Sequence, residues 1–393
     1  MKRLRVIIVV VFMALVLPLS VLEVCTIAGK LRPIKELPDP FLFNNGTRVD
    51  SEADWFTRRE EIKELLADIE YGHMPPAPDG LNATLMGARL LTAPDPACTE
   101  YSYNVTVIPS NSTLAQNFTF RMYVYIPPGP GPFPCILRVG YGFHPTPIIR
   151  GYAFSYYENL DLDPDEDVIG PAESAYPGYD WGSLAIWAWG LMRAVDVLQR
   201  IPAIDASKII STGHSRGGKV ALIAAAYDER IAVAAPTQSG TGSVGSFLLY
   251  GPGSETLATM VAPDNFDYWF QQSFGDYAGR EIELPFDQHF LKALVAPRYL
   301  ACIEAWDYEW GNPEGNWATH LAALEVFKFL GVPEHLGITW RNGGHTFHDN
   351  LENGAVCDFA DKIFYGMAVN RSFNLPPFYG CGTANAYFRW SSP

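Results

Sequence analysis

The residues best suited to chemistry lie in one short run, Gly213-His214-Ser215-Arg216-Gly217, which matches the pattern G-x-S-x-G. An apolar run at 208–212 precedes it and an alanine-rich segment at 219–227 follows it, so Ser215 is predicted to lie on a tight turn between a strand and a helix. Glycines there let neighbouring backbones pass closely, and the amino end of the next helix favours developing negative charge. The pattern predicts Ser215 as a nucleophile; the alternative is a glycine-rich turn whose serine only caps the helix.

A nucleophilic serine needs a base, and the histidines that follow Ser215 are His289, His320, His335, His345 and His348. Of these, His345 lies in a loop directly after a strand-like run near the end of the chain, so it is the predicted base. His348 and Asp349 beside it suggest a metal site, but no third group of ligands accompanies them, and we expect no metal. His289 is expected to be a hydrogen-bonded structural residue.

The elements that must position these residues follow from the hydrophobic pattern. From residue 134 onward, short continuous apolar runs alternate with segments of helical period. The apolar runs are 135–139, 208–212, 231–235, 299–303 and 338–340, and the helical segments are 183–199, 219–227, 317–329 and 359–367. This alternation is typical of a mostly parallel sheet with helices on both faces, and with the serine turn it predicts an α/β-hydrolase three-layer sandwich. A helix at 55–71 and antiparallel strands at about 85–126 are predicted before it.

Composition limits the class of protein. The chain has 393 residues, of which 48% are apolar and 18% charged, as in a globular protein. Its 28 Lys and Arg residues against 43 Asp and Glu residues give a net charge of −15, and no basic run lies beyond the first five residues. Nucleic-acid binding is therefore disfavoured. The oligomeric state stays open.

The amino-terminal residues predict export. Lys2, Arg3 and Arg5 precede an apolar stretch at 6–22, so residues 1–30 are expected to form a signal peptide or a membrane anchor, and the sequence leaves both open. Contact with a membrane is expected only through such an anchor. Six Asn-x-Ser/Thr sites also indicate export; they are Asn45, Asn82, Asn104, Asn111, Asn117 and Asn370. We expect a secreted or membrane-anchored extracellular glycoprotein with residues 31–393 as a single α/β-hydrolase domain.

The six cysteines are scattered, with no Cys-x-x-Cys pair of the kind used for zinc or redox chemistry. Cys98, Cys357 and Cys381 lie in loop-like or terminal contexts and are the expected partners if disulfides form. Cys135 and Cys302 lie in apolar runs and are expected to be small buried hydrophobic residues. Neither a metal nor an organic cofactor is expected.

Several motifs together resemble the glucuronoyl esterases, also called 4-O-methyl-glucuronoyl methylesterases. They are the serine turn with Gly218 and Lys219, the runs 37–41, 284–289 and 296–298, Ile303-Glu304 ahead of Trp310, and Gly344-His345. The similarity extends from about residue 36 to residue 367. It implies a serine esterase that cleaves esters between glucuronic acid on xylan and lignin alcohols.

The resemblance also implies roles for single residues. Ser215 is the implied nucleophile, Arg216 supports the oxyanion and Lys219 binds the sugar. Trp310 matches a tryptophan that stacks on the sugar, although a simple packed aromatic is the alternative. Glu255 falls near the region where relatives contact the uronate hydroxyls.

The chain departs from the family at the acid of the triad. Many members carry a Glu where this chain has Gln238, and an amide cannot stabilise the imidazolium that forms in the transition state. Some relatives take the acid from the loop after a later strand, which here contains Asp307, the predicted acid. Glu309 and Glu304 are the alternatives.

Two other functions remain open at this point. The same serine machinery would also serve an acetyl esterase acting on polysaccharide or an esterase for another small uronate ester. A non-catalytic surface protein that reuses the hydrolase fold is the third hypothesis. The natural alcohol and the need for a 4-O-methyl group are not determined.

Overall fold

The structure is a computed structural model, and it describes residues 36–110, 116–262, 265–378 and 380–393. The predicted signal or anchor at 1–30, Cys25 and the glycosylation site Asn111 lie outside the described residues. Within the described ranges, no helix is both long enough and apolar enough to cross a membrane.

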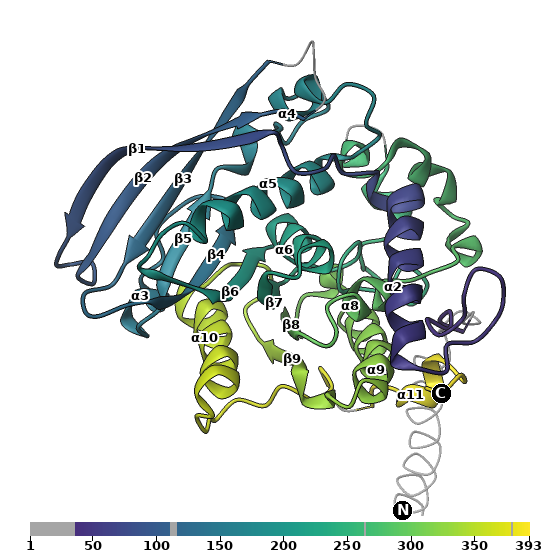
Figure 1. Ribbon diagram of the computed structural model, residues 1–393. Helices are drawn as coiled ribbons and strands as arrows, with labels where there is room; N and C mark the ends of the chain where they lie inside the picture. The colour runs from purple at the N-terminus through teal and green to yellow at the C-terminus, as the bar shows by residue number, and fades with distance from the viewer. Residues whose placement is uncertain (1–35, 111–115, 263–264, 379) are drawn as a thin grey trace, which may run out of the picture. The chain divides into compact units, whose positions relative to one another are not determined.

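One mixed sheet forms the centre of the part described, 36–393 (Figure 1). Its nine described strands follow the order β1-β2-β3-β5-β4-β6-β7-β8-β9. The β1–β2, β2–β3 and β3–β5 pairs are antiparallel, whereas β5, β4, β6, β7, β8 and β9 are mutually parallel. The strands are β1 Gly80–Leu91, β2 Cys98–Ile108, β3 Phe118–Ile126, β4 Phe133–Val139, β5 Ala153–Tyr157, β6 Ile204–His214, β7 Ile231–Thr237, β8 Tyr299–Ala305 and β9 Leu336–Arg341.

Helices cover both faces of this sheet, as Figure 1 shows. The longer helices are α2 Glu52–Leu66, α5 Ser183–Leu198, α6 Arg216–Tyr227, α9 Pro313–Phe329 and α10 Asp349–Tyr365. The short α-helices are α3 Pro145–Ile149, α4 Pro171–Ala175, α7 Leu257–Met260, α8 His289–Ala293 and α11 Ala384–Tyr387, and a π-helical turn, Ala67–Tyr71, continues α2.

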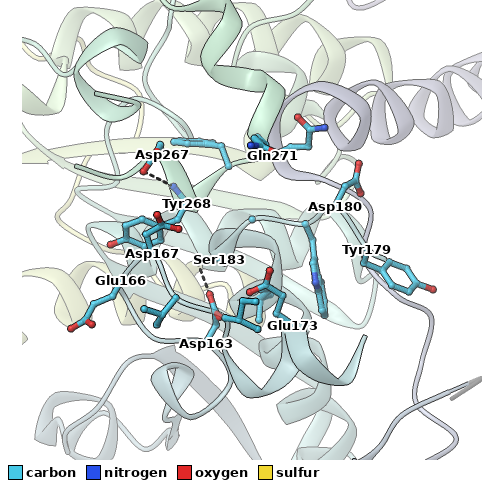
Figure 2. A pocket seen from close by; sticks show the side chains of 17 residues that line it. Asp163, Glu166, Asp167, Glu173, Tyr179, Asp180, Ser183, Asp267, Tyr268 and Gln271 are labelled. Atoms are coloured by element: carbon cyan, nitrogen blue, oxygen red, sulfur yellow. Dashed lines mark hydrogen bonds between the residues drawn. The ribbon is translucent and has the colours of Figure 1, made fainter. Parts of the chain in front are cut away.

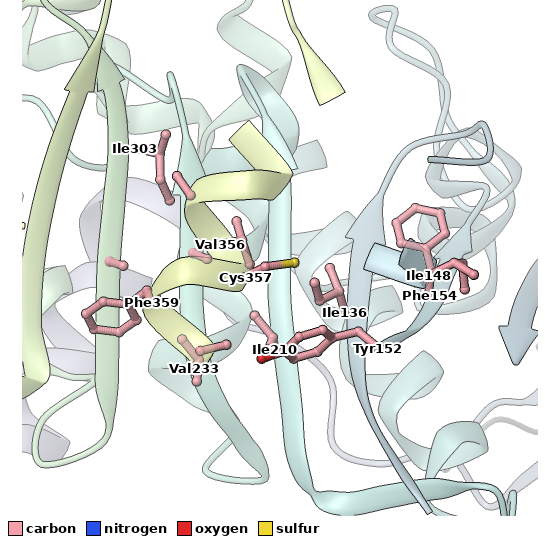
Figure 3. Packing of buried hydrophobic residues seen from close by; sticks show 14 of the residues in the cluster. Ile136, Ile148, Tyr152, Phe154, Ile210, Val233, Ile303, Val356, Cys357 and Phe359 are labelled. Carbon is pink, nitrogen blue, oxygen red and sulfur yellow. The ribbon is translucent and has the colours of Figure 1, made fainter. Parts of the chain in front are cut away.

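Neighbouring residues of β6 show why α6 and α10 lie on opposite faces. Ser211 Oγ donates to the carbonyl of Ala221 in α6, at 2.9 Å. Ile210, one residue earlier, packs in the apolar cluster that contains Val356 and Phe359 of α10 (Figure 3). Because successive strand side chains point to opposite faces, the two helices flank the sheet from opposite sides. The α/β-hydrolase sandwich predicted from the sequence is thereby confirmed.

The apolar runs that predicted the parallel strands lie within those strands and are mostly buried. Ile136, Ile210, Val233 and Ile303 come from four adjacent strands and meet in the cluster of Figure 3. A strand covered on both faces needs no polar alternation, which is why these runs are continuous.

Two elements differ from the predictions. Helix α10 begins at Asp349, ten residues before the predicted start at Phe359, and His348 precedes it directly. Its first turns carry polar residues such as Glu352 and Asn353 that are buried nonetheless, so the hydropathy pattern does not reveal this part of the helix. Strand β5 was not predicted.

The cysteines also differ in part. Cys135 and Cys302 are buried in strands, as predicted. Cys98 and Cys357 were expected in loop-like contexts, but Cys98 begins β2 and Cys357 lies in α10, and both are buried. Each of these four, and the half-buried Cys381, is a free thiol in the structure. The loop interpretation is therefore wrong for Cys98 and Cys357.

Candidate active site

Ser215 lies at the junction of β6 and α6 with φ 58° and ψ −125°, a conformation that non-glycine residues rarely adopt. Its N–H donates to the carbonyl of Thr237 at the end of β7, at 3.0 Å. Its own carbonyl accepts the N–H groups of Gly218 and Lys219 and so begins the helix. This is the strained serine turn that the sequence predicts.

The glycines around Ser215 are required by close backbone packing. A Cβ at Gly213 would lie 2.2 Å from the carbonyl oxygen of Gly217, and one at Gly218 would lie 2.9 Å from the Thr237 carbonyl oxygen. Neither atom is the end of a flexible side chain, so neither can move aside. These contacts fix the turn that raises Ser215 into the pocket.

His345 lines the same pocket as Ser215, from the loop between β9 and α10. Its ring is half-buried and stacks on Tyr308, with ring centroids 4.6 Å apart and planes at 15°. On another side lies the His214 ring, with centroids 4.7 Å apart. The Nδ1 atom of His345 is buried and has no hydrogen-bond partner among the described residues.

His214 holds the loop that carries His345. Its Nε2 lies 2.8 Å from the His345 carbonyl oxygen, which can only accept, so Nε2 carries the proton. Burial, together with the nearby His345 and Arg138, lowers the pKa of His214 to about 3, so the ring stays neutral. The variable residue of the serine turn thus has a positioning contact that the sequence did not reveal.

The surroundings of His345 disfavour its protonated form. Burial is the main cause, and the cations Lys219, Arg341 and Arg216 add to it, so the pKa of His345 is lowered to about 4. A neutral imidazole is the form that accepts a proton from serine.

Asp307, the predicted acid, is exposed and binds the loop of His345 through the backbone. Its carboxylate accepts the N–H groups of Gly343 at 2.8 Å and Gly344 at 3.2 Å. The Gly343 N–H is also the main cause of its lowered pKa. The structure gives Asp307 no hydrogen bond to the His345 ring.

The other acid candidates lie in different surroundings. Glu304 is buried in β8 and accepts the N–H of Ser239 at 3.2 Å, and burial raises its pKa to about 8. Glu309 is exposed. Gln238 is buried after β7 with φ 46°, and its Nε2 donates to Glu352 at 2.9 Å.

Arg216 turns its guanidinium toward Asp165, with which it forms an ion pair. The guanidinium also lies over the ring of Trp269, 4.9 Å from its centroid. Asp165 in addition accepts the Tyr268 hydroxyl and the Trp269 indole N–H, each at 3.0 Å. The side chain predicted to support an oxyanion is thus held against an aromatic wall beside Ser215.

Lys219, Glu255 and Trp310 come together at the pocket, as the resemblance implies. Lys219 is buried, and its Nζ donates to the carbonyls of Ser239 and Thr241 and, at 3.1 Å, to Glu255. The Glu255 N–H donates to the Trp310 carbonyl at 2.9 Å. Trp310 is 38% exposed, so its ring is not a packed core aromatic.

All predicted site residues except Asp307 line one cavity of about 370 Å³. Its walls also contain residues that the sequence analysis missed, namely Ser239, Gly240, Asn265, Phe266, Trp269, Tyr308 and Gly311. Tyr308 could have been found, since it stands between Asp307 and Trp310. Phe266 and Trp269 lie in a long irregular segment that carries no motif.

A second cavity of about 540 Å³ contains none of the predicted residues (Figure 2). Six carboxylate side chains line it, and Figure 2 shows the hydrogen bond that the Ser183 hydroxyl donates to Asp163. Its lining includes Tyr268 and Phe270, the two neighbours of Trp269, which lines the cavity of Ser215.

His348, at which no metal is expected, lies directly before Asp349, the first residue of α10. Asp349 there accepts Thr146 N–H at 3.0 Å and Asn353 Nδ2 at 2.7 Å. Among the described residues, one group of three His and acid side chains has converging ligand atoms, Glu64, Asp68 and His73, outside the active-site cavity.

Comparison with known proteins identifies the family. The family model for fungal glucuronyl esterases matches residues 110–331. A 4-O-methyl-glucuronoyl methylesterase 1 of Wolfiporia cocos is 30% identical over 383 residues, covering 91% of this chain and 88% of that protein. The corresponding enzyme of Phanerochaete carnosa is 32% identical over 354 residues, covering 85% of this chain and 82% of that protein.

Solved structures agree with this relationship. A carbohydrate esterase family 15 glucuronoyl esterase from Caldicellulosiruptor kristjansonii has a TM-score of 0.80 and 29% identity, covering 93% of this chain and 99% of that chain. The glucuronoyl esterase catalytic domain from Hypocrea jecorina has a TM-score of 0.76 and 26% identity, covering 93% and 98%. A serine-to-alanine mutant from Sporotrichum thermophile, in complex with methyl 4-O-methyl-β-D-glucopyranuronate, has a TM-score of 0.72 and 26% identity, covering 86% and 90%. The chain therefore belongs to the glucuronoyl esterase family and is a carboxylic ester hydrolase.

Proposed function

We propose that this enzyme hydrolyses esters of glucuronic acid, of the kind that joins xylan to lignin, with Ser215 as nucleophile. The observation that carries the proposal is that Ser215, His345, Arg216 and Lys219 line one cavity. Its volume suits a single sugar ring with its ester group. The Sporotrichum relative is in complex with the methyl ester of the 4-O-methyl form of this sugar acid.

In the proposed mechanism, Ser215 Oγ attacks the ester carbonyl carbon while His345 takes the hydroxyl proton. The tetrahedral oxyanion is stabilised by Arg216 and by the amino end of α6. When the intermediate collapses, His345 gives its proton to the leaving alcohol, and the glucuronoyl group stays on Ser215 as an ester. Water, deprotonated by His345, then attacks the carbonyl carbon of this ester. The bond to Ser215 Oγ breaks, His345 returns the proton to Ser215, and the free acid leaves.

Asp307 is proposed as the acid of the triad. Its hydrogen bonds to Gly343 and Gly344 support a role in placing His345, because they hold the two residues directly before it. A carboxylate close to the imidazolium lowers the energy of the charged transition state.

Lys219, Glu255 and Trp310 are proposed to recognise the uronate, whereas Gln238, predicted with them, has its amide nitrogen bound to Glu352. Lys219 donates to the Ser239 and Thr241 carbonyls and to Glu255, so it binds a sugar hydroxyl by exchanging one of these three partners. Glu255 offers an acceptor, and the half-exposed indole of Trp310 offers a face for the ring. Export is proposed too; the sites Asn45, Asn82, Asn117 and Asn370 are exposed, as attachment of glycans requires.

Hydrolysis of benzyl glucuronate, measured beside an acetyl ester and a p-nitrophenyl acyl series, tests the proposal. We expect the glucuronate ester to be preferred, whereas a preference for the acetyl ester would favour a polysaccharide acetyl esterase. Ser215→Ala should remove the activity and the labelling by a fluorophosphonate while leaving the fold intact. An unlabelled parent enzyme would favour a non-catalytic surface protein.

The acid is tested by Asp307→Asn, for which we expect a loss of up to ~10⁴ in kcat. Gln238→Ala is expected to lose much less, and adding Gln238→Glu to Asp307→Asn should recover part of the activity. A fully active Asp307→Asn enzyme would reject Asp307 as the acid.

A further inference from the structure

We propose that Gln238, held by the buried carboxylate of Glu352, positions the imidazole of His345 by accepting its Nδ1 proton. This inference rests on the proposed function, since it concerns the same base. It assigns Gln238 and Glu352 as positioning residues that act from the buried side of the site. Glu352 was not among the residues singled out from the sequence.

The orientation of the Gln238 amide follows from its partner. Gln238 Nε2 donates to Glu352 Oε1 at 2.9 Å, and a carboxylate can only accept, so the amide nitrogen must face Glu352. The amide oxygen then faces elsewhere; it is buried and has no partner among the described residues. The Gln238 backbone is fixed as well, since its N–H donates to the Ile303 carbonyl at 2.8 Å while φ is 46°. A strained, buried residue with an unused acceptor is typical of a functional site.

His345 has the matching unused donor. A base that takes a proton from Ser215 through Nε2 carries its own proton on Nδ1, and that N–H needs an acceptor. Nδ1 of His345 is buried without a partner among the described residues, and both His345 and Gln238 line the cavity of Ser215. Tyr308 stacks on the imidazole and His214 packs beside it, so the ring has few other orientations available. A hydrogen bond between Nδ1 and the Gln238 amide oxygen would satisfy both atoms.

Glu352 is built into the loop that carries His345. It is fully buried in the first turn of α10, where it accepts Arg341 Nε at 2.7 Å and the His348 N–H at 2.9 Å. Arg341 in turn donates to the carbonyls of Asn342 and Thr346, at 2.7 and 2.6 Å. The ion pair therefore holds the backbone on both sides of His345, and through Gln238 it reaches the imidazole.

The charges around His345 show what this arrangement does. Burial and three cations lower the pKa of His345, and no carboxylate counteracts them. The negative charge of Glu352 is shared with Arg341 and passes to the imidazole only through the dipole of a neutral amide. Gln238 therefore fixes the tautomer and the ring orientation, while it stabilises the imidazolium less than a carboxylate in contact would.

The test compares Gln238→Leu, Glu352→Gln and the exchange variant Gln238→Glu/Glu352→Gln, each assayed with benzyl glucuronate across pH. Gln238→Leu removes the acceptor at similar volume, so kcat should fall roughly tenfold or more with little change in KM. The exchange variant places a carboxylate next to His345, so the acid limb of kcat/KM should move up by about 1–3 pH units while kcat is retained. A merely structural role would leave that limb in place.

Glu70→Gln is the matched control, because Glu70 is also fully buried and also binds a glutamine amide, that of Gln288, but does not line the active-site cavity. It should leave kcat unchanged. If Glu352→Gln fails to fold, Gln238→Leu and the single variant Gln238→Glu, which should also raise the acid limb, still decide the matter.

The inference would be overturned if Gln238→Leu kept the parent kcat, or if the exchange variant kept the parent pH profile. Full activity of both beside an inactive Asp307→Asn would assign the whole role to Asp307. These outcomes require an active parent enzyme, whereas failure of the proposed function would appear as a parent that does not hydrolyse the glucuronate ester or as an active Ser215→Ala.

Discussion

At the scale of single residues, the active site combines a strained nucleophile with a base kept neutral by its surroundings. Ser215 has φ 58°, and its backbone is tied to Thr237 and α6. His345 is half-buried next to three cations, and its pKa is lowered to about 4. His345 is therefore neutral in the free enzyme down to a pH of about 4.

The pH dependence of kcat/KM follows from the pKa of His345. The base is active when unprotonated, so activity should be lost as pH falls through its pKa, near 4 rather than near the ordinary value of 6.5. A pH–rate profile with benzyl glucuronate checks this. An acid limb centred at the ordinary histidine value would show that the cations do not act on His345 as described.

Arg216→Ala should lower kcat roughly 10²–10³-fold, because one oxyanion donor is lost. Arg216→Lys should recover part of this loss, since a cation can reach the same oxygen but not in the same geometry. Steady-state kinetics separate the possibilities. A change confined to KM would mean that Arg216 binds substrate and does not stabilise the oxyanion.

At the scale of elements, the junctions after β6, β7, β8 and β9 supply the chemistry. Parallel strands end at the same edge of the sheet, so Ser215, Gln238, Asp307 and His345 are brought to one region although they span 131 positions. The ring centroids of His214 and His345, which lie 4.7 Å apart, illustrate this. This junction requires glycine at position 213, because the backbone of Gly217 in the first turn of α6 packs directly against Gly213.

Gly213→Ala is expected to abolish activity and to destabilise the fold, because its Cβ would overlap the Gly217 carbonyl. Gly354→Ala is the matched control. Gly354 lies within α10 with open space at the Cβ position, so alanine should stabilise the protein by about 0.5–1 kcal/mol. Urea unfolding of both variants, with activity assays, tests the pair. A Gly213→Ala enzyme as stable and active as the parent would contradict the described turn.

At the scale of the whole molecule, buried ionisable groups make stability depend on pH in both directions. Burial lowers the pKa values of His214, His289 and His320 to about 3, and it raises those of Glu70 and Glu304 to about 8. The histidines are thus neutral in the folded state where the unfolded chain is protonated. The two glutamates are protonated in the folded state where the unfolded chain is charged.

The unfolding free energy should be largest between the ordinary pKa values of glutamate, 4.5, and histidine, 6.5. As pH falls from about 8 to 6.5, the folded state binds more protons through the glutamates, so stability rises. Between 6.5 and 4.5 the two effects oppose each other, because the unfolded chain now protonates its histidines. Below about 4.5 only the histidine effect is left, so stability falls. Urea unfolding at about pH 4, 5.5 and 8 checks this. Greater stability at pH 8 than at 5.5 would contradict the assigned burial of Glu70 and Glu304.

The sequence by itself determined the elements and the principal chemistry. The continuous apolar runs predicted β4, β6, β7, β8 and β9, because strands covered on both faces carry no polar alternation. The G-x-S-x-G turn predicted Ser215, because its glycines meet a steric requirement that is local in the chain. His345 followed from its place after the last strand, and the family followed from motifs spread along the chain.

Only the tertiary structure decided which groups surround the base. Glu352 lies in a polar helical turn, and a hydropathy pattern cannot show that this turn is buried. It accepts a hydrogen bond from Gln238, 114 positions away in the sequence. Asp307, which sequence order favoured, binds the backbone of the His345 loop, and His214 holds that loop from β6. Such contacts depend on how strands and loops pack, and a hydrogen bond between distant segments leaves no periodic pattern in either of them.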